Sequence, residues 1–393
     1  MRLAYIALIS VALLSAACSS AVDGSAVKQS GAAKGPAVDV SKLDVGPYST
    51  QPSQPLGVAG DPSRGVLVEA QRMANNVVGP WEVDSTLTGW FGFGATVLQT
   101  ADSLANIGPQ QFAVAAGQHS FVNGFVSART AEGQKILLNA VLRFADEGSA
   151  AAAAKDFGDI AANTGDGVQR AQIPGHPDAQ AASYTQTEGS TGKRWGAVRA
   201  FTAHGPYVLM QLAQAVDGTD PALGLVAKAI DLQGPAIDKF RATDPAEFGD
   251  ISLDPTGLLA RTLPVPDKEA TPIQNTTYEQ RGALQFQNDP TRSAALFNQT
   301  GTDLVAMAKT NVYQTKDSES AARIVDGFYA ELQPTSQPAK PVNNLPDSRC
   351  LQLKDKSFYC LGAADRYAIE TTSANLLDAQ QQVAAQYAML IGS

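Results

Sequence analysis

Residues 141–157 read VLRFADEGSAAAAAKDF and residues 312–328 read VYQTKDSESAARIVDGF, and this pair of stretches decides the fold. In both, a short apolar run is followed by an aspartate, a serine three positions after it and a closing phenylalanine. Ser149 and Ser320 lie 171 positions apart, and so do the two phenylalanines. An aspartate ahead of an Ala-rich run caps the free amides of a helix's first turn. The pattern therefore predicts a strand-and-helix unit that occurs twice.

Each unit is followed by apolar–polar alternation, which predicts three strands and then a helix. The first copy has these strands at 182–186, 194–203 and 207–213 and the helix at 221–231. The second copy has them at 350–353, 357–361 and 367–372, with the helix at 376–390. We expect an α+β fold of two tandem related modules, each a small antiparallel sheet with helices on one face.

The helix starts Asp61-Pro62 and Asp289-Pro290 also look alike, since Asp caps a helix and Pro suits its first position. They lie 228 positions apart rather than 171, which predicts an insertion in the first copy at about 79–136. The expected boundaries are 58–245 for the first module and 246–393 for the second.

The composition is that of a globular protein and excludes some functions. The chain has 393 residues, of which 44% are hydrophobic, and this length suggests two domains. The formal net charge of −9 argues against nucleic acid as a partner, because that role needs clustered Lys and Arg. Three Cys and three His leave little material for a metal site, so no metal and no cofactor are expected.

The N-terminus predicts export. The apolar run from Leu3 to Ala17 is too short to span a bilayer, which takes about 20 helical residues, and suits a signal peptide over 1–17. It ends Leu14-Ser15-Ala16-Ala17-Cys18, which resembles a bacterial lipobox, although the aliphatic Leu14 stands one place early. We expect a lipid on Cys18 that anchors the chain to the extracytoplasmic face of the cell membrane. An ordinary secretory signal or an uncleaved anchor are the alternatives.

Residues 18–57 separate this leader from the first module. They are rich in Ser, Ala, Gly and Pro and poor in large apolar residues before Leu43, which predicts a flexible tether. Its end, residues 43–48, is expected to dock on the folded part.

The other two cysteines fit an exported chain. Cys350 and Cys360 flank a hairpin pattern, and pairing about Asp355 would place them opposite each other. Directly opposite residues lie within disulfide reach, and thiols outside the cytoplasm are oxidised. A disulfide is therefore expected, with two buried thiols as the alternative.

Aromatic residues between glycines mark residues 79–94. Trp81, Trp90, Phe91 and Phe93 could present a flat apolar face to lipid or sugar, which makes them the candidate ligand contacts. The alternative interpretation is that they fill the core between the two copies.

Catalytic motifs are not found. The sequence has no Gly-x-Ser-x-Gly elbow, and Gly189-Ser190-Thr191-Gly192-Lys193 lacks the flanking residues of a phosphate loop, so that it suits a hairpin turn. The three histidines are scattered, with only His119 beside a serine, Ser120. Glu82 and Asp84 near Trp81 are better interpreted as solvated acids, and Glu69 and Arg72 as a surface contact on one helix. No catalytic residue is assigned.

The lipobox, residues 43–48, and the run 71–84 together resemble a family of actinobacterial cell-envelope lipoproteins, found in mycobacteria and their relatives. The resemblance implies a cell-surface lipoprotein and carries no catalytic residues. The expected function is non-enzymatic binding of an envelope lipid, glycan or protein partner. An accessory subunit of an envelope complex and, less favoured, a cell-wall hydrolase are the alternatives.

Overall fold

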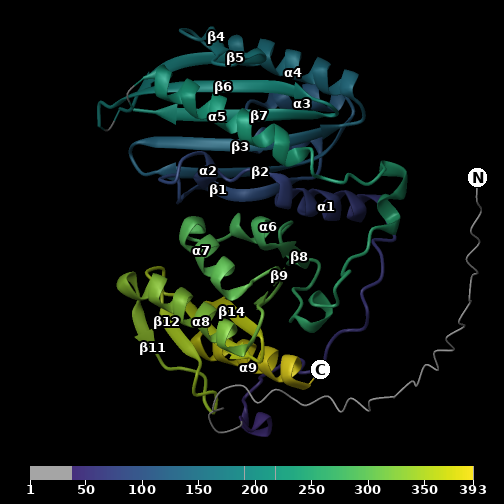
Figure 1. Cartoon of the computed structure of the whole chain (residues 1–393), viewed down its shortest axis with the longest axis vertical. Helices are drawn as coiled ribbons and strands as arrows, with labels where there is room; N and C mark the ends of the chain where they lie inside the picture. Colours follow the sequence, from purple (N-terminus) through teal and green to yellow (C-terminus); the bar gives the residue numbers. More distant parts are fainter. Residues whose placement is uncertain (1–37, 190, 217, 393) are drawn as a thin grey trace, which may run out of the picture. The chain divides into compact units, whose positions relative to one another are not determined.

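A computed structural model describes residues 38–189, 191–216 and 218–392. The expected signal peptide over 1–17 and the expected lipidation site Cys18 lie outside the described residues. Within the described part, two seven-stranded antiparallel sheets carry the fold (Figure 1). The first sheet contains β1 (Gly89–Leu98), β2 (Phe121–Ala131), β3 (Lys135–Phe144), β4 (Gln169–Ile173), β5 (His176–Thr187), β6 (Arg194–His204) and β7 (Tyr207–Ala215). The second contains β8 (Thr276–Glu279), β9 (Leu304–Met307), β10 (Asn311–Gln314), β11 (Gln337–Ala339), β12 (Arg349–Gln352), β13 (Phe358–Ala364) and β14 (Tyr367–Ser373).

The two sheets have the same topology. Their strand orders are β1-β2-β3-β7-β6-β5-β4 and β8-β9-β10-β14-β13-β12-β11, so each strand of the first sheet has its counterpart seven strands later. The structure confirms two tandem α+β modules.

The helices repeat in the same way. α4 (Glu147–Ala162) and α8 (Ser318–Leu332) follow the third strand of each module, and their caps Asp146 and Asp317 accept from the amides of Ser149 and Ser320. α5 (Thr219–Ile237) and α9 (Leu376–Gly392) follow the seventh strand. The shorter helices are α1 (Pro62–Met73), α2 (Pro80–Val83), α3 (Gln110–Gln118), α6 (Gln280–Leu284) and α7 (Pro290–Thr300).

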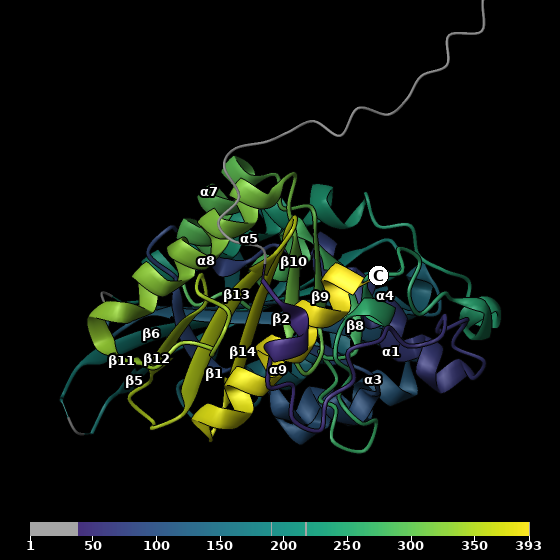
Figure 2. The same ribbon diagram turned by 90° about the horizontal axis from the view of Figure 1, so that it is seen from below.

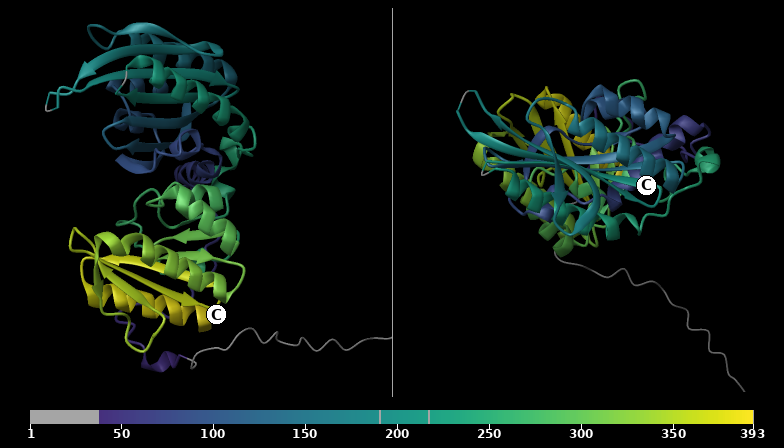
Figure 3. Two further views of the ribbon diagram at one scale, coloured as in Figure 1. Left: turned by 60° about the vertical axis from the view of Figure 1, so that its left-hand side comes forward. Right: turned by 90° about the horizontal axis from the view of Figure 1, so that it is seen from above.

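Helices cover both faces of each sheet, whereas the sequence had placed them on one face. On β3, Val141 packs in the same cluster as Val226 of α5. The adjacent Leu142, which points to the other face, packs with Phe157 of α4. The second sheet likewise lies between α8 and α9 (Figure 3).

The segment 79–136 has counterparts in the second module. α7 lies between β8 and β9, the place that α3 takes between β1 and β2, whereas α1 precedes its sheet. The helix starts at Asp61 and Asp289 are therefore not equivalent, and the insertion derived from them corresponds to strands that both modules possess. The first module is longer partly because β2 and β3 have 11 and 10 residues, against 4 each in β9 and β10.

Residues 43–48 dock on the second module, as the sequence led us to expect. The Tyr48 hydroxyl donates to the Asp378 carboxylate at the start of α9 at 2.5 Å. Val45 and Tyr48 pack against Leu263 and Met389, and Figure 2 shows this N-terminal segment beside α9. No helix in the described ranges is long and apolar enough to cross a membrane.

Candidate functional site

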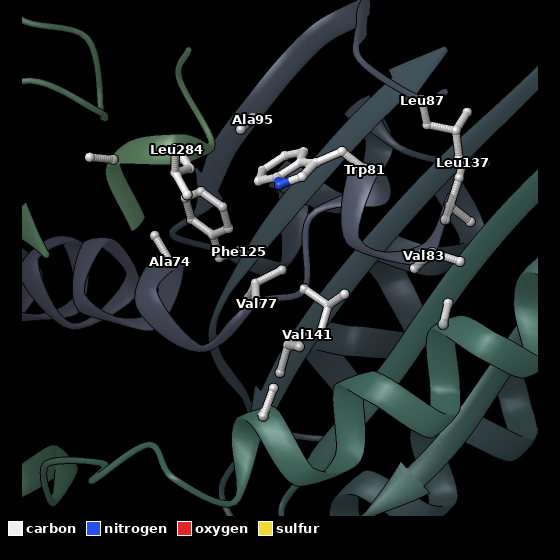
Figure 4. Packing of buried hydrophobic residues seen from close by; sticks show 14 of the residues in the cluster. Ala74, Val77, Trp81, Val83, Leu87, Ala95, Phe125, Leu137, Val141 and Leu284 are labelled. Carbon is white, nitrogen blue, oxygen red and sulfur yellow. The ribbon is translucent and has the colours of Figure 1, made fainter. Parts of the chain in front are cut away.

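Trp81, one of the four candidate aromatic contacts, is a core residue. Its side chain lies among Phe125, Val77 and Leu284, and the residue is 7% exposed (Figure 4). Since Leu284 belongs to α6 of the second module, this cluster joins the two modules. The structure thus corrects the ligand-contact interpretation for Trp81.

Trp90 and Phe93 remain at the surface, with exposed fractions of 45% and 43%. Phe91 is half-buried and packs against the core cluster that also contains Phe112 of α3 and Phe157 of α4. Gly92 and Gly94 have φ angles of +56° and +72°, and the pairing of β1 with β2 shifts register between Trp90 and Ala95. These glycines permit a bulge that side chains would strain.

Arg129 lies beneath Trp90, and the sequence did not point to it. Its guanidinium is 3.6 Å from the centroid of the Trp90 ring. The residue is fully buried, and its guanidinium donates to the carbonyls of Thr88 at 3.0 Å and of Gln285 and Gln287 at 2.8 Å each. Burial lowers the pKa of Arg129 to about 10, so that it is charged at neutral pH. A strand of the first module is thereby bonded to the backbone of the second.

A cleft of about 490 Å³ lies at the junction of the two modules and is the candidate site. One wall comes from α1 and the turn after it, with Val68, Arg72, Asn75 and Asn76. The opposite wall comes from β8 and β9, with Thr276, Thr277, Glu279 and Leu304. The segments between the modules complete it with Lys239, Phe240, Arg241, Ser252, Leu253, Pro255 and Thr256. Its volume is in the range of small-molecule sites.

A second hollow of about 390 Å³ adjoins this cleft, since both are lined by Val68 and Leu253. It also lies between the modules, with Gln71 of α1 on one side and Gln274 on the other. Two adjoining hollows therefore lie along the junction between the modules.

Two cations of the cleft are unpaired. Within the described ranges, neither Lys239 nor Arg241 has a carboxylate within 4 Å of its charged group, and both residues are exposed. Arg72, by contrast, is held in place by the Glu69 carboxylate and the Thr243 hydroxyl.

Glu69 is fully buried, and this corrects the expected surface contact with Arg72. Its carboxylate also accepts from Arg143 at 3.1 Å and from the Thr243 amide at 2.7 Å. Two guanidinium groups share one carboxylate, so the cluster keeps one net positive charge. It ties α1, β3 and the segment after α5 together beside the cleft.

The histidines and carboxylates that were candidates for catalysis do not come together in one site. The histidines pair with three different aspartates, namely His119 with Asp156, His176 with Asp231 and His204 with Asp238. Glu82 accepts from the Gly79 amide and from Arg281, whereas Asp84 pairs with Lys135. No group of three or more potential metal ligands is found in the described part of the chain.

A half-buried carboxylate in the second module, Glu370, is packed against two buried tyrosines. Glu370 accepts from the hydroxyls of Tyr313 and Tyr359, and burial raises the pKa of both tyrosines. The hollow beside it is only about 30 Å³, enough for about one water molecule.

The hairpin disulfide is confirmed. Cys350 and Cys360 lie directly opposite each other on β12 and β13, with Cα atoms 4.2 Å apart, and are bonded.

Two family models match the chain. The model described as "Domain of unknown function (DUF7373) N-terminal" matches residues 56–253, and its C-terminal companion matches residues 258–393. A search of curated proteins finds no match. The solved extracellular domain of PknH from Mycobacterium tuberculosis is similar to this chain at 16% identity, over 47% of this chain and 99% of that one, with a TM-score of 0.29. Because the two family models together span most of the residues, the protein belongs to the DUF7373 family.

Proposed function

We propose that this protein is a lipid-anchored lipoprotein of the actinobacterial cell envelope that binds an envelope ligand, without catalysis, in the cleft between its modules. The observation that carries the proposal is the cleft of about 490 Å³ with walls from both modules. Ligand sites occur preferentially at such junctions.

The extracytoplasmic location is supported by two independent features. The leader with Cys18 has the residues of an export signal that ends in a lipidated cysteine. The bonded pair of Cys350 and Cys360 suits an oxidising compartment.

Binding is favoured over catalysis by the groups that line the cleft. Its polar lining consists mainly of amides, hydroxyls and the cations Arg72, Lys239 and Arg241, with one carboxylate, Glu279. Such groups hold a ligand by hydrogen bonds and charge, whereas general acid–base catalysis needs groups that exchange protons near neutral pH.

Contact with a protein partner or lipid through Trp90 and Phe93 is the second candidate. Both side chains are exposed, although Trp90 lies over the Arg129 guanidinium and donates to Asn288 of the second module at 3.2 Å. Replacing Phe93 with alanine would abolish capture of that partner or lipid while changing the melting temperature little, whereas Trp90→Ala would also remove the contacts with Arg129 and Asn288. A large loss of stability would instead indicate a structural role.

The cleft is tested by filling it. The full-length chain is extracted from membranes in neutral detergent and examined by native mass spectrometry for a retained small molecule. We expect it in the wild type and in Thr187→Trp, an exposed strand position outside the cleft, but not in Thr277→Trp. Melting temperatures verify that the variants fold. Equal retention in both variants, or no retained molecule in the wild type, would overturn the proposal.

A further inference from the structure

We propose that the ligand of the junction cleft is a phosphate-bearing polyol, an inference that rests on the proposed function and names its ligand class. Lys239, Arg241 and Arg72 line the cleft, against the single carboxylate of Glu279. The chain as a whole carries a net charge of −9, so this local excess of positive charge runs against the general composition.

The excess positive charge survives when the neighbouring Glu69 is included. That carboxylate is shared by Arg72 and Arg143 and compensates only one of them. Lys239 and Arg241 have no partner of opposite charge within 4 Å in the described ranges. Phosphate is the anion best matched to this set, because Arg donates to it through a planar fork and Lys as a compact point charge.

The uncharged lining suits hydroxyl groups. Asn75 uses its side-chain oxygen to accept from the Gly282 amide, which leaves its NH2 group as a donor. Asn76 uses its NH2 group to donate to the Ala236 carbonyl, which leaves its oxygen as an acceptor. The hydroxyls of Thr276 and Thr277 add groups that both donate and accept. A polyol offers the complementary donors and acceptors.

The same chemistry can come from a soluble sugar phosphate or from a phospholipid headgroup, and one experiment separates them. The full-length chain in neutral detergent is treated with an amine-acetylating reagent, and acetylation of each lysine is followed by mass spectrometry. The probes are glycerol 3-phosphate, glycerol as its neutral match, and micelles that contain either phosphatidylglycerol or phosphatidylcholine. Lys354 and Lys356, at the exposed tip of the β12–β13 hairpin, are internal controls.

We expect glycerol 3-phosphate or phosphatidylglycerol to slow acetylation of Lys239 severalfold, and glycerol and phosphatidylcholine to have no effect. Protection by both charged probes indicates that the phosphate suffices, and protection by phosphatidylglycerol alone indicates a membrane lipid. Arg241→Gln should weaken the protection at least about tenfold, the effect of one charge-assisted bond. Arg194→Gln, an exposed arginine in the first module, should leave it unchanged.

The two proposals fail differently. If glycerol protects Lys239 as well as glycerol 3-phosphate does, and Thr277→Trp removes both effects, the cleft binds a ligand but the phosphate inference is overturned. If no probe protects Lys239, the ligand class is overturned, while the molecule retained in native mass spectrometry tests the cleft independently. Protection that persists in Thr277→Trp would overturn both.

Discussion

Replacing Arg129 with methionine removes the buried cation that bonds β2 to the second module while keeping an unbranched apolar side chain of similar length. Three carbonyls, those of Thr88, Gln285 and Gln287, lose their donor. Each unsatisfied buried acceptor costs about 1–3 kcal/mol, and loss of the Trp90 ring contact adds about 0.5–2 kcal/mol. The variant no longer has to bury a charged group, and the avoided desolvation penalty offsets several kcal/mol of this loss. We therefore expect a net loss of about 2–4 kcal/mol in the free energy of unfolding.

The assay is urea unfolding at pH 7, followed by tryptophan fluorescence and, independently, by circular dichroism. Arg194→Met is the matched control, and we expect it to change the free energy of unfolding by less than about 0.5 kcal/mol because Arg194 is exposed. Arg129→Lys should fall between the two, since it keeps the charge without the planar fork. If Arg129→Met matched the control, the reasoning that these bonds hold the modules together would be refuted.

Three further outcomes are expected. Glu69→Gln should lower the free energy of unfolding by about 3–5 kcal/mol in denaturant titrations, because it leaves Arg guanidiniums without their buried counter-charge; a change below about 1 kcal/mol would contradict this. Burial would raise the pKa of Asp84, but the ammonium of Lys135 and the groups of Thr86 lower it to about 2. The lowered pKa contributes stability that is fully present above pH 4 and is lost as the pH falls through 2. Asp84→Asn should therefore cost about 1–2 kcal/mol at pH 7 and much less at pH 2; a difference in melting temperature that does not vary with pH would be inconsistent with this. Replacing Cys350 and Cys360 by serine should cost about 2–3 kcal/mol, as for a short closed loop, and peptide mapping of the wild type without reductant should recover the two cysteine peptides joined.

Most of the helices and strands could be predicted from local sequence patterns. Aspartates ahead of Ala-rich runs became the caps of α4 and α8, because capping depends on residues within one turn. Alternation about Asp355 placed Cys350 opposite Cys360, because register in a hairpin is set by the turn between its strands. The faces of the sheets that the helices cover were harder to predict. β3 is buried on both faces, and the residues near it in the sequence do not indicate which elements cover each face.

Long-range packing decided the rest. Trp81 and Trp90 belong to the same glycine-rich segment, yet one is buried against Leu284 while the other lies exposed over Arg129. The sequence predicted Glu69 to be a surface acid, because its donors on β3 and on the segment after α5 lie far from it in the sequence. The sequence by itself determined the repeated elements and the hairpin pairing, since these depend on neighbours within a few residues. Only the tertiary structure decided which side chains are buried and that a cationic cleft forms, because those partners lie up to about two hundred positions apart and meet only when the modules pack.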